Sequence, residues 1–209
     1  MHDIMTETAL IQPDKGQHAI TLHLVNEAGF PGWAKTLSDG QRAMLEAQGF
    51  TGKGYHTAIV PATPGNGSAW FAAGGVADPD SLSSWCLAKL AEVLPEGTYR
   101  LEGREPGPAL HGWQTAQYRN LSYRSDPDVT GPRVLLTSNV NAIEPAIAEA
   151  QAVNLVRRLV DTPPEDMGPA GLEAEIEALA KAHDAKLEVT RGDQLEQNYP
   201  LVHAVGRAA

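Results

Sequence analysis

Histidine is the residue type in this chain that most directly suggests metal chemistry, and the sequence contains seven. Protein metal sites usually draw on several ligands at a regular spacing, such as two histidines one turn apart on a helix or paired cysteines. His18 and His23 are five residues apart on an expected strand, so their side chains would point to opposite faces. Four other histidines have no second histidine at helical spacing and no cysteine partner: His56, His111, His183 and His203. We interpret these histidines as solvated or packed side chains and expect no metal ligand in this chain.

Two other short patterns could carry chemistry. Glu165 and Asp166 form an acidic pair suited to acid-base catalysis, but they lie just before Pro169, where acidic side chains stabilise the start of a helix. Gly74 and Gly75 follow an expected strand, yet both glycine-rich phosphate-binding patterns are missing there, and a turn that ends the strand is the simpler interpretation. The serines lack the Gly-x-Ser-x-Gly pattern of a nucleophile. We therefore expect no catalytic residue and no cofactor-binding residue.

The composition is that of an ordinary soluble globular protein, with 42% hydrophobic and 20% charged residues. A net charge of −10 disfavours a surface for nucleic acid or anionic lipid. No apolar run approaches the roughly 18 residues that a membrane span needs. The acidic residues 1–7 lack the basic and apolar regions of a secretory signal. These features predict a cytoplasmic protein that neither enters a membrane nor binds nucleic acid.

The single cysteine and the four tryptophans are expected to serve packing. Cys86 has no disulfide partner in the chain and lies close to Leu82 and Leu90, so we interpret it as a small buried side chain. The tryptophans have few of the basic neighbours that a base-stacking platform for nucleic acid requires. We expect all four to anchor the core: Trp33, Trp70, Trp85 and Trp113.

The first 140 residues predict alternating strands and helices. Strands are expected over residues 18–25, 55–61, 68–73, 98–102 and 133–138. The second and third of these, joined by a turn at residues 64–67, are expected to form a hairpin. Helices are expected over residues 39–47, ended by Gly49, over 81–94, capped by Asp80 or Ser81, and over 108–123. The alternation predicts an α/β layer fold with a mixed sheet flanked by helices.

Residues 141–163 predict a linker helix. Asn141 and Glu144 resemble a capping box, and Pro145 falls in the first turn, where proline is tolerated. At ~1.5 Å per residue, a helix over residues 141–160 spans about 30 Å, enough to bridge two domains. Its expected apolar stripe consists of Ala148, Ala152, Leu155, Val156, Leu159 and Val160. We predict three parts: a domain at 1–140, the linker at 141–163 and the start of a second domain at 164–209.

The third part begins a second α/β pattern. A helix is expected from Pro169, with Leu172, Ile176 and Leu179 at helical spacing. Strands are expected over residues 186–190 and 201–205, with a short helical turn between them at 193–197. One helix and two strands cannot enclose a core. We therefore expect residues 164–209 to be poorly ordered, docked on the first domain or paired with another chain.

Two runs of the sequence resemble the leucyl (cytosol) aminopeptidases. Residues 157–169, Arg-Arg-Leu-Val-Asp-Thr-Pro-Pro-Glu-Asp-Met-Gly-Pro, are similar to the family's linker helix and the turn after it. Residues 199–207, Tyr-Pro-Leu-Val-His-Ala-Val-Gly-Arg, are similar to the strand that begins its catalytic domain. Asp161 stands where asparagine is usual and Ala209 near where serine is common, and neither position is expected to do chemistry. A looser pattern resembles the last helix of the family's N-terminal domain: Gly112, Tyr118, Arg119 and Tyr123.

The resemblance implies a hexameric enzyme that removes N-terminal residues from peptides with two divalent metal ions, manganese or zinc. Paired metals suit this reaction because one holds the attacking water while both stabilise charge on the scissile carbonyl. The resemblance also implies that the family's metal ligands and catalytic residues come after the motif that ends this chain, so no site residue is carried over. It implies a macro-domain-like N-terminal lobe, whose expected role is to shape assembly and access to the active site. The second domain would be the truncated start of a zinc-peptidase-like fold, and the 209-residue chain alone would be inactive.

Two alternatives remain at this point. A macro-domain-like lobe could be a binding module for a nucleotide or ADP-ribose, with Gly74 and Gly75 as its candidate phosphate contact. The chain could also be a structural protein that was derived from a peptidase and serves only in assembly.

Overall fold

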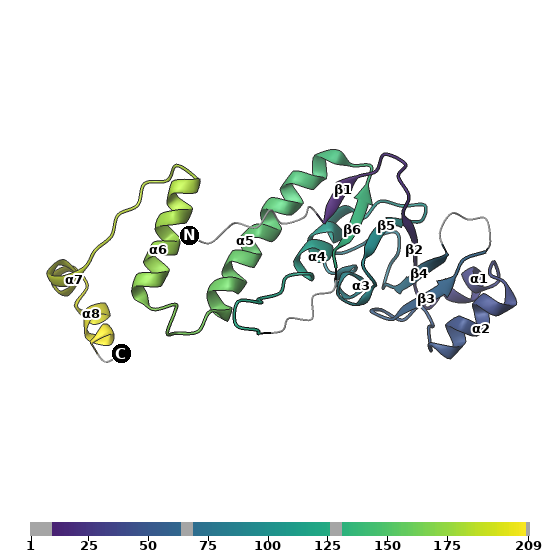
Figure 1. The fold of residues 1–209 in the computed structure, drawn as a ribbon, viewed down its shortest axis with the longest axis horizontal. Helices are drawn as coiled ribbons and strands as arrows, with labels where there is room; N and C mark the ends of the chain where they lie inside the picture. Colours follow the sequence, from purple (N-terminus) through teal and green to yellow (C-terminus); the bar gives the residue numbers. More distant parts are fainter. Residues whose placement is uncertain (1–9, 64–68, 126–130, 208–209) are drawn as a thin grey trace. The chain divides into compact units, whose positions relative to one another are not determined.

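Figure 1 shows a computed structural model of the chain, which describes residues 10–63, 69–125 and 131–207. The chain divides into two compact units, Met1–Arg158 and Leu159–Ala209. The first unit is built on a six-stranded sheet with helices, which confirms the predicted α/β class. The strands are β1 (Ile11–Pro13), β2 (Ile20–Val25), β3 (Thr57–Pro61), β4 (Trp70–Gly75), β5 (Gly97–Leu101) and β6 (Arg133–Thr137).

The sheet is mixed, with the strand order β1-β6-β5-β2-β4-β3. β3 and β4 are antiparallel, with Ile59 opposite Ala72, whereas the other neighbouring strands run parallel. The predicted hairpin is therefore confirmed, and the turn expected at residues 64–67 lies outside the described residues. The sequence pattern did not reveal β1, which places Ile11 beside Leu135 of β6.

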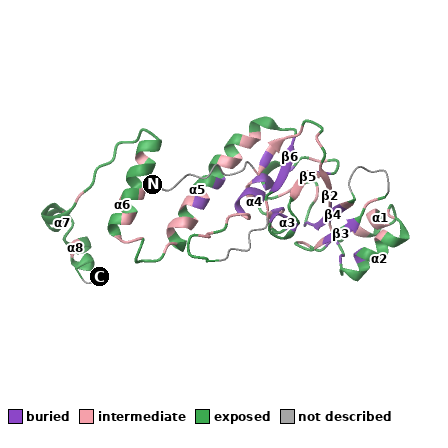
Figure 2. Cartoon of the chain, in the orientation of Figure 1, coloured by how far each residue is buried: buried purple, intermediate pink, exposed green. Residues whose placement is uncertain are grey.

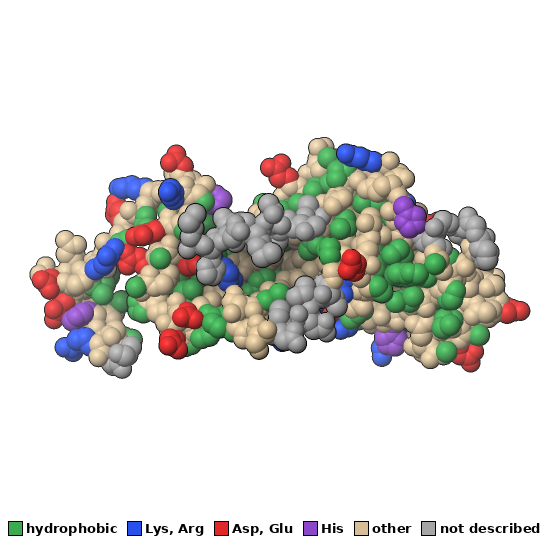
Figure 3. All heavy atoms as spheres, viewed as in Figure 1, with side chains coloured by type: hydrophobic (Ala, Val, Ile, Leu, Met, Phe, Trp, Pro, Cys, Tyr) green, Lys and Arg blue, Asp and Glu red, His purple; other side chains and the backbone are tan. Residues whose placement is uncertain are grey.

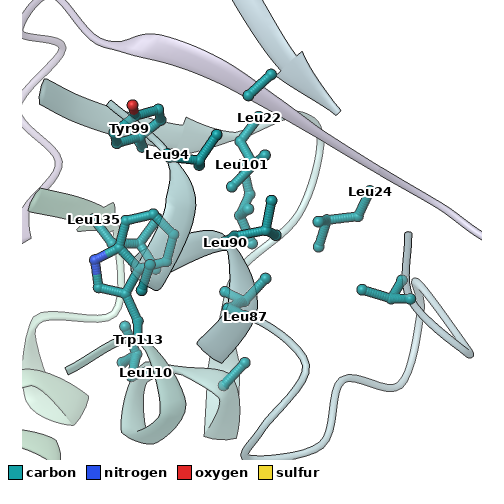
Figure 4. Close-up of a cluster of buried hydrophobic side chains, with 14 of the residues drawn as sticks. Leu22, Leu24, Leu87, Leu90, Leu94, Tyr99, Leu101, Leu110, Trp113 and Leu135 are labelled. Atoms are coloured by element: carbon teal, nitrogen blue, oxygen red, sulfur yellow. The ribbon is translucent and has the colours of Figure 1, made fainter. Parts of the chain in front are cut away.

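The larger hydrophobic core lies on one face of this sheet (Figure 4). Because side chains alternate along a strand, Leu22 and Leu24 of β2 point to the same face and meet Leu90 of the helix α3 (Ala88–Val93). Trp113 of α4 (Leu110–Thr115) is fully buried in this core, and its Nε1 donates to the Arg133 carbonyl oxygen at 2.9 Å. This hydrogen bond ties α4 to β6.

A smaller core lies on the opposite face, at the end of the sheet that carries β3 and β4. Phe71 and Ala73 of β4 pack there with Leu45 of α2 (Asp39–Ala47) and with Trp33 of α1 (Phe30–Ala34). The helix predicted at residues 39–47 is confirmed. Ser38 caps it by accepting from the Gln41 backbone N–H while the Gln41 side chain accepts from the Ser38 N–H, a complete capping box.

Two predicted helices are shorter than expected. Residues 81–83 are irregular and residues 84–87 form turns, so α3 starts at Ala88 and the caps proposed at Asp80 or Ser81 were wrong. The helix expected over 108–123 consists of a 3-10 turn, η1 (Gly107–Ala109), and α4, which ends at Thr115. The contact between α4 and the turn at Ser84 explains part of this difference. The Gly112 N–H of α4 donates to the Ser84 carbonyl oxygen at 2.8 Å, and this oxygen would be used by the helix itself if residues 81–94 were helical.

Trp85 corrects the expectation that every tryptophan anchors the core. Its segment is a turn, so its side chain is 47% exposed and rests edge-on against His111, with ring centroids 4.9 Å apart. Trp33 and Trp70 are half-buried against the two cores, and only Trp113 is fully enclosed. The half-buried Cys86 packs against the larger core as expected.

The long helix predicted after residue 140 is confirmed as α5 (Ile143–Asp161), preceded by the 3-10 turn η2 (Val140–Ala142). The predicted apolar stripe was wrong in its position. Ile143 and Ile147 pack against the larger core and Ala150 is fully buried, whereas Val156 and Val160 are exposed. The face toward the core thus starts earlier in the helix than the sequence pattern indicated.

The second unit contains three helices after α5: α6 (Pro169–Ala182), α7 (Gly192–Asn198) and α8 (Pro200–Gly206). The helix from Pro169 is confirmed, but the strand expected at 201–205 is helical, and the one expected at 186–190 has no regular structure. A strand needs a neighbour to pair with, and no strand is described in this unit, whereas Pro200 sits at a helix start that suits proline. None of its described residues is buried, as Figure 2 shows for α6, α7 and α8.

Within the described residues, no helix has both the length and the apolar character required to cross a bilayer.

Candidate functional site

His23 is half-buried and packs against two aromatic rings. It lies on β2 with its ring centroid 5.5 Å from that of Trp33 and 5.0 Å from that of Phe71. Burial lowers the pKa of the imidazole, and the nearby Glu102 carboxylate offsets only part of this effect. His23 is therefore a packed side chain, neutral near pH 7, and His18 lies in the segment before the strand.

The other histidines also stand apart from one another. His111 of α4 has Nδ1 3.4 Å from a Glu149 carboxylate oxygen of α5, and His203 of α8 has Nδ1 3.9 Å from Glu196. His56 and His183 are exposed. Across residues 10–63, 69–125 and 131–207, no three histidine, cysteine or acidic side chains are grouped to hold a metal ion. The described donors therefore do not fit the two-metal centre that the resemblance implies.

Gly74 and Gly75 are strand residues with protein on every side. A Cβ at Gly75 would lie 1.9 Å from the Lys53 carbonyl oxygen, and one at Gly74 would lie 2.6 Å from a methyl carbon of Leu90. The Gly75 N–H donates to the His56 carbonyl oxygen at 2.8 Å, so it has no capacity left for a phosphate. These glycines allow close packing, and the proposed phosphate contact at this position has no structural support. The predicted turn at the strand end is also corrected, since both lie inside β4.

Glu165 and Asp166 are both exposed and lie in the turn between α5 and α6. The N–H groups of Asp166 and Met167 donate to the Pro163 carbonyl oxygen, which shapes this turn. The pair precedes the N-terminus of α6, as the sequence predicted.

One apolar hollow of about 360 Å³ lies in the first unit, between α1, α2 and the segment that follows α2. Its floor consists of Phe30, Leu45 and Phe50, of which the last two are almost completely buried. Arg42 and Glu46 of α2 stand at the same hollow, one helical turn apart. Sequence reasoning missed it because it missed α1, although Pro31 in the first turn and the spacing of Phe30, Trp33 and Ala34 indicate a short amphipathic helix.

The family sequence model of the M17 aminopeptidase N-terminal domain matches residues 20–132, which is more than half of the chain. The chain belongs to the M17 aminopeptidase family. The matched residues include β2 to β5 and α1 to α4, so these four strands and four helices belong to an M17 N-terminal domain. This confirms the predicted membership of the leucyl aminopeptidase family.

Solved structures share this fold. The cytosol aminopeptidase of Coxiella burnetii superposes with a TM-score of 0.77 and 24% identity over 95% of this chain and 43% of its own. A mutant of tomato leucine aminopeptidase gives a TM-score of 0.63 and 15% identity over 90% of this chain and 45% of its own. The bottromycin maturation enzyme BotP in complex with Mn gives a TM-score of 0.61 and 20% identity, over 86% of this chain and 39% of its own. Among curated proteins, no sequence matches this chain.

This M17 chain thus spans less than half the length of each of these structures. At such identities the structural likeness establishes the fold of the chain and no more.

Proposed function

We propose that this chain is the N-terminal, non-catalytic portion of a two-metal aminopeptidase that removes N-terminal residues from peptides. The family match over residues 20–132 carries the proposal. BotP, which shares the fold, has been solved in complex with Mn, and this supports manganese or zinc as the metal of the complete enzyme. The metal ligands and the peptide site would then lie in protein outside these 209 residues.

The first unit suits a scaffold role. Several of its charged side chains are engaged in structural contacts, such as the Arg100–Asp14 pair and the Glu105 carboxylate, which accepts from the hydroxyls of Thr137 and Ser138. We infer that this unit shapes assembly, as a hexamer in the cytoplasm, and controls access to the active site of the complete enzyme.

The second unit suits a connecting role. Its exposed apolar side chains have no core of their own; those of α6 are Leu172, Ile176 and Leu179. Exposed apolar stripes of this kind are stabilised when another surface covers them. We infer that the catalytic portion of the enzyme provides that surface.

Activity reconstitution tests this proposal. The 209-residue chain is assayed with leucine p-nitroanilide and Mn²⁺ or Zn²⁺, alone and fused to the catalytic domain of an M17 aminopeptidase. We expect no hydrolysis by the chain alone, and hydrolysis together with hexamers by light scattering when the chain is fused to such a domain. Metal-dependent hydrolysis by the chain alone would contradict the non-catalytic assignment. A fusion that assembles without hydrolysis would favour the purely structural alternative.

A further inference from the structure

The hollow between α1 and α2 combines an apolar floor with two opposite charges. Phe30, Leu45 and Phe50 line its floor, and its volume of about 360 Å³ lies near the lower end of the range for small-molecule sites. Figure 3 shows apolar side chains gathered over the neighbouring part of the domain, where β2, β4 and β3 lie. A hollow of about 360 Å³ suits one compact apolar group better than an extended chain.

Arg42 is held in place beside this hollow. Its guanidinium donates to the Leu37 carbonyl oxygen and to the Asp39 carboxylate, which restrains its position before any ligand arrives. A guanidinium has further N–H donors, so Arg42 can still bind a carboxylate.

Glu46 supplies the opposite charge one helical turn later. Its carboxylate forms no ion pair or hydrogen bond with any described side chain, although it lines the same hollow as Arg42. Residues four apart on a helix are neighbours on its surface. The Arg42 guanidinium, which binds anions, and the Glu46 carboxylate, which binds cations, therefore lie side by side at the apolar hollow.

We propose that this hollow is a binding site for a free α-amino acid with a branched aliphatic or aromatic side chain. The ligand carboxylate binds Arg42, its ammonium group binds Glu46, and its side chain contacts the half-buried Phe30 and Ala34. An α-amino acid carries both charges on one carbon beside its side chain, which matches this arrangement. A residue within a peptide lacks both charges and fits it less well.

The biological meaning of the site rests on the proposed function, because free amino acids are what an aminopeptidase releases. Occupation of the hollow would let the scaffold domain sense the released product. Binding itself is a property of this chain and can be measured without any peptidase activity, so failure of one proposal is distinguishable from failure of the other.

Amide NMR of the complete 209-residue chain, titrated with L-leucine, tests the site. We expect saturable millimolar binding, with shifts confined to α1, α2 and residues 49–51. The fluorescence of Trp33 gives a second readout, because its ring centroid lies 6.3 Å from those of both Phe30 and Phe50. Glycine, 4-methylpentanoate and leucinamide serve as ligand controls, since each lacks one of the three binding features.

Four variants complete the experiment. Glu46→Gln and Arg42→Gln are each expected to weaken leucine binding about two- to fivefold, as loss of one exposed charge contact implies. Ala34→Phe fills the hollow and is expected to abolish binding, whereas Glu27→Gln, in an exposed turn and not among the lining residues, leaves binding unchanged. Circular dichroism checks that each variant is folded. The proposal is overturned if leucine causes no saturable shifts, or if 4-methylpentanoate and leucinamide bind as tightly as leucine.

Discussion

Arg100 of β5 forms a salt bridge with Asp14, the residue that follows β1, on the other side of β6. Its Nη2 donates to Asp14 Oδ1 at 2.8 Å, and its Nε donates to the other carboxylate oxygen. The same guanidinium donates to the Gln17 carbonyl oxygen at 2.9 Å. Since the strand order is β1-β6-β5, this bidentate pair fastens the short edge strand β1 to the centre of the sheet.

Replacement of Asp14 tests the contribution of this pair to stability. The hydrogen bonds from Arg100 and from the Gly16 N–H lower the pKa of Asp14 from 3.8 to about 2. The pair therefore stabilises the fold above the ordinary pKa of the carboxyl and loses this effect as the pH falls toward about 2. Because Arg100 is 36% exposed, solvent screening reduces the expected contribution to about 1 kcal/mol.

Urea unfolding of the native chain and of Asp14→Asn at pH 7 and at pH 2 measures this effect. We expect Asp14→Asn to be less stable by about 1 kcal/mol at pH 7 and the difference to become much smaller at pH 2, near the folded-state pKa of Asp14. The double variant with Arg100→Gln is the control, because it separates the pairwise energy from the loss of each side chain. An equal difference at both pH values would show that the ion pair is not the cause.

Trp113 is expected to be the most costly single truncation in the larger core. It is fully buried and donates to the Arg133 carbonyl oxygen, so Trp113→Ala creates a cavity and should cost about 4 kcal/mol. Trp113→Phe retains most of the packing, and the Gln117 Nε2 still donates to the same carbonyl oxygen at 2.9 Å, so about 1–2 kcal/mol is expected. Equilibrium unfolding by near-ultraviolet circular dichroism gives both values. Equal losses for the two variants would contradict the role assigned to packing.

Gly75 provides a test of close backbone packing. A Cβ at this position would meet the Lys53 carbonyl oxygen at 1.9 Å, so Gly75→Ala must displace backbone and should cost about 2 kcal/mol. Gly40→Ala is the matched control, because nothing lies within 4 Å of its added Cβ in α2. Alanine is the better helix former there, and a gain of up to about 1 kcal/mol is expected. Thermal unfolding compares the pair, and tolerance of alanine at residue 75 would contradict the contact.

Amide hydrogen exchange distinguishes the two units. The neighbouring strands β5 and β6 contribute buried side chains to the larger core, so their amides should exchange only through global unfolding. None of the described residues of α6, α7 or α8 is buried, so their amides should exchange with opening free energies near zero in a dilute solution of the chain. Protection of α6 equal to that of β6 would show that another surface covers it.

The separation of the histidines from one another could be read from their spacing alone. Histidines that are far apart in the sequence also lie on different elements of the structure. His23, His111 and His203 lie on β2, α4 and α8, and each contacts aromatic or single acidic side chains. The hollow beside Arg42 and Glu46 could not be read in this way. Its floor joins Phe30, Leu45 and Phe50 from three consecutive segments, and only the packing of α1 on α2 leaves space between them.

Local pattern by itself determined the hairpin of β3 and β4, the helix α2 and the long helix α5, because each carries turn, cap or periodicity signals within its own residues. The two runs that resemble the leucyl aminopeptidases, residues 157–169 and 199–207, could likewise be recognised from their own residues alone. Tertiary structure decided the rest. β1 exists because β6 pairs with it, Trp85 is exposed because α4 crosses the turn at Ser84, and residues 201–205 are helical where no neighbouring strand is described. Each of these depends on a partner distant in the sequence, and the residues of the segment contain no information about whether that partner is present.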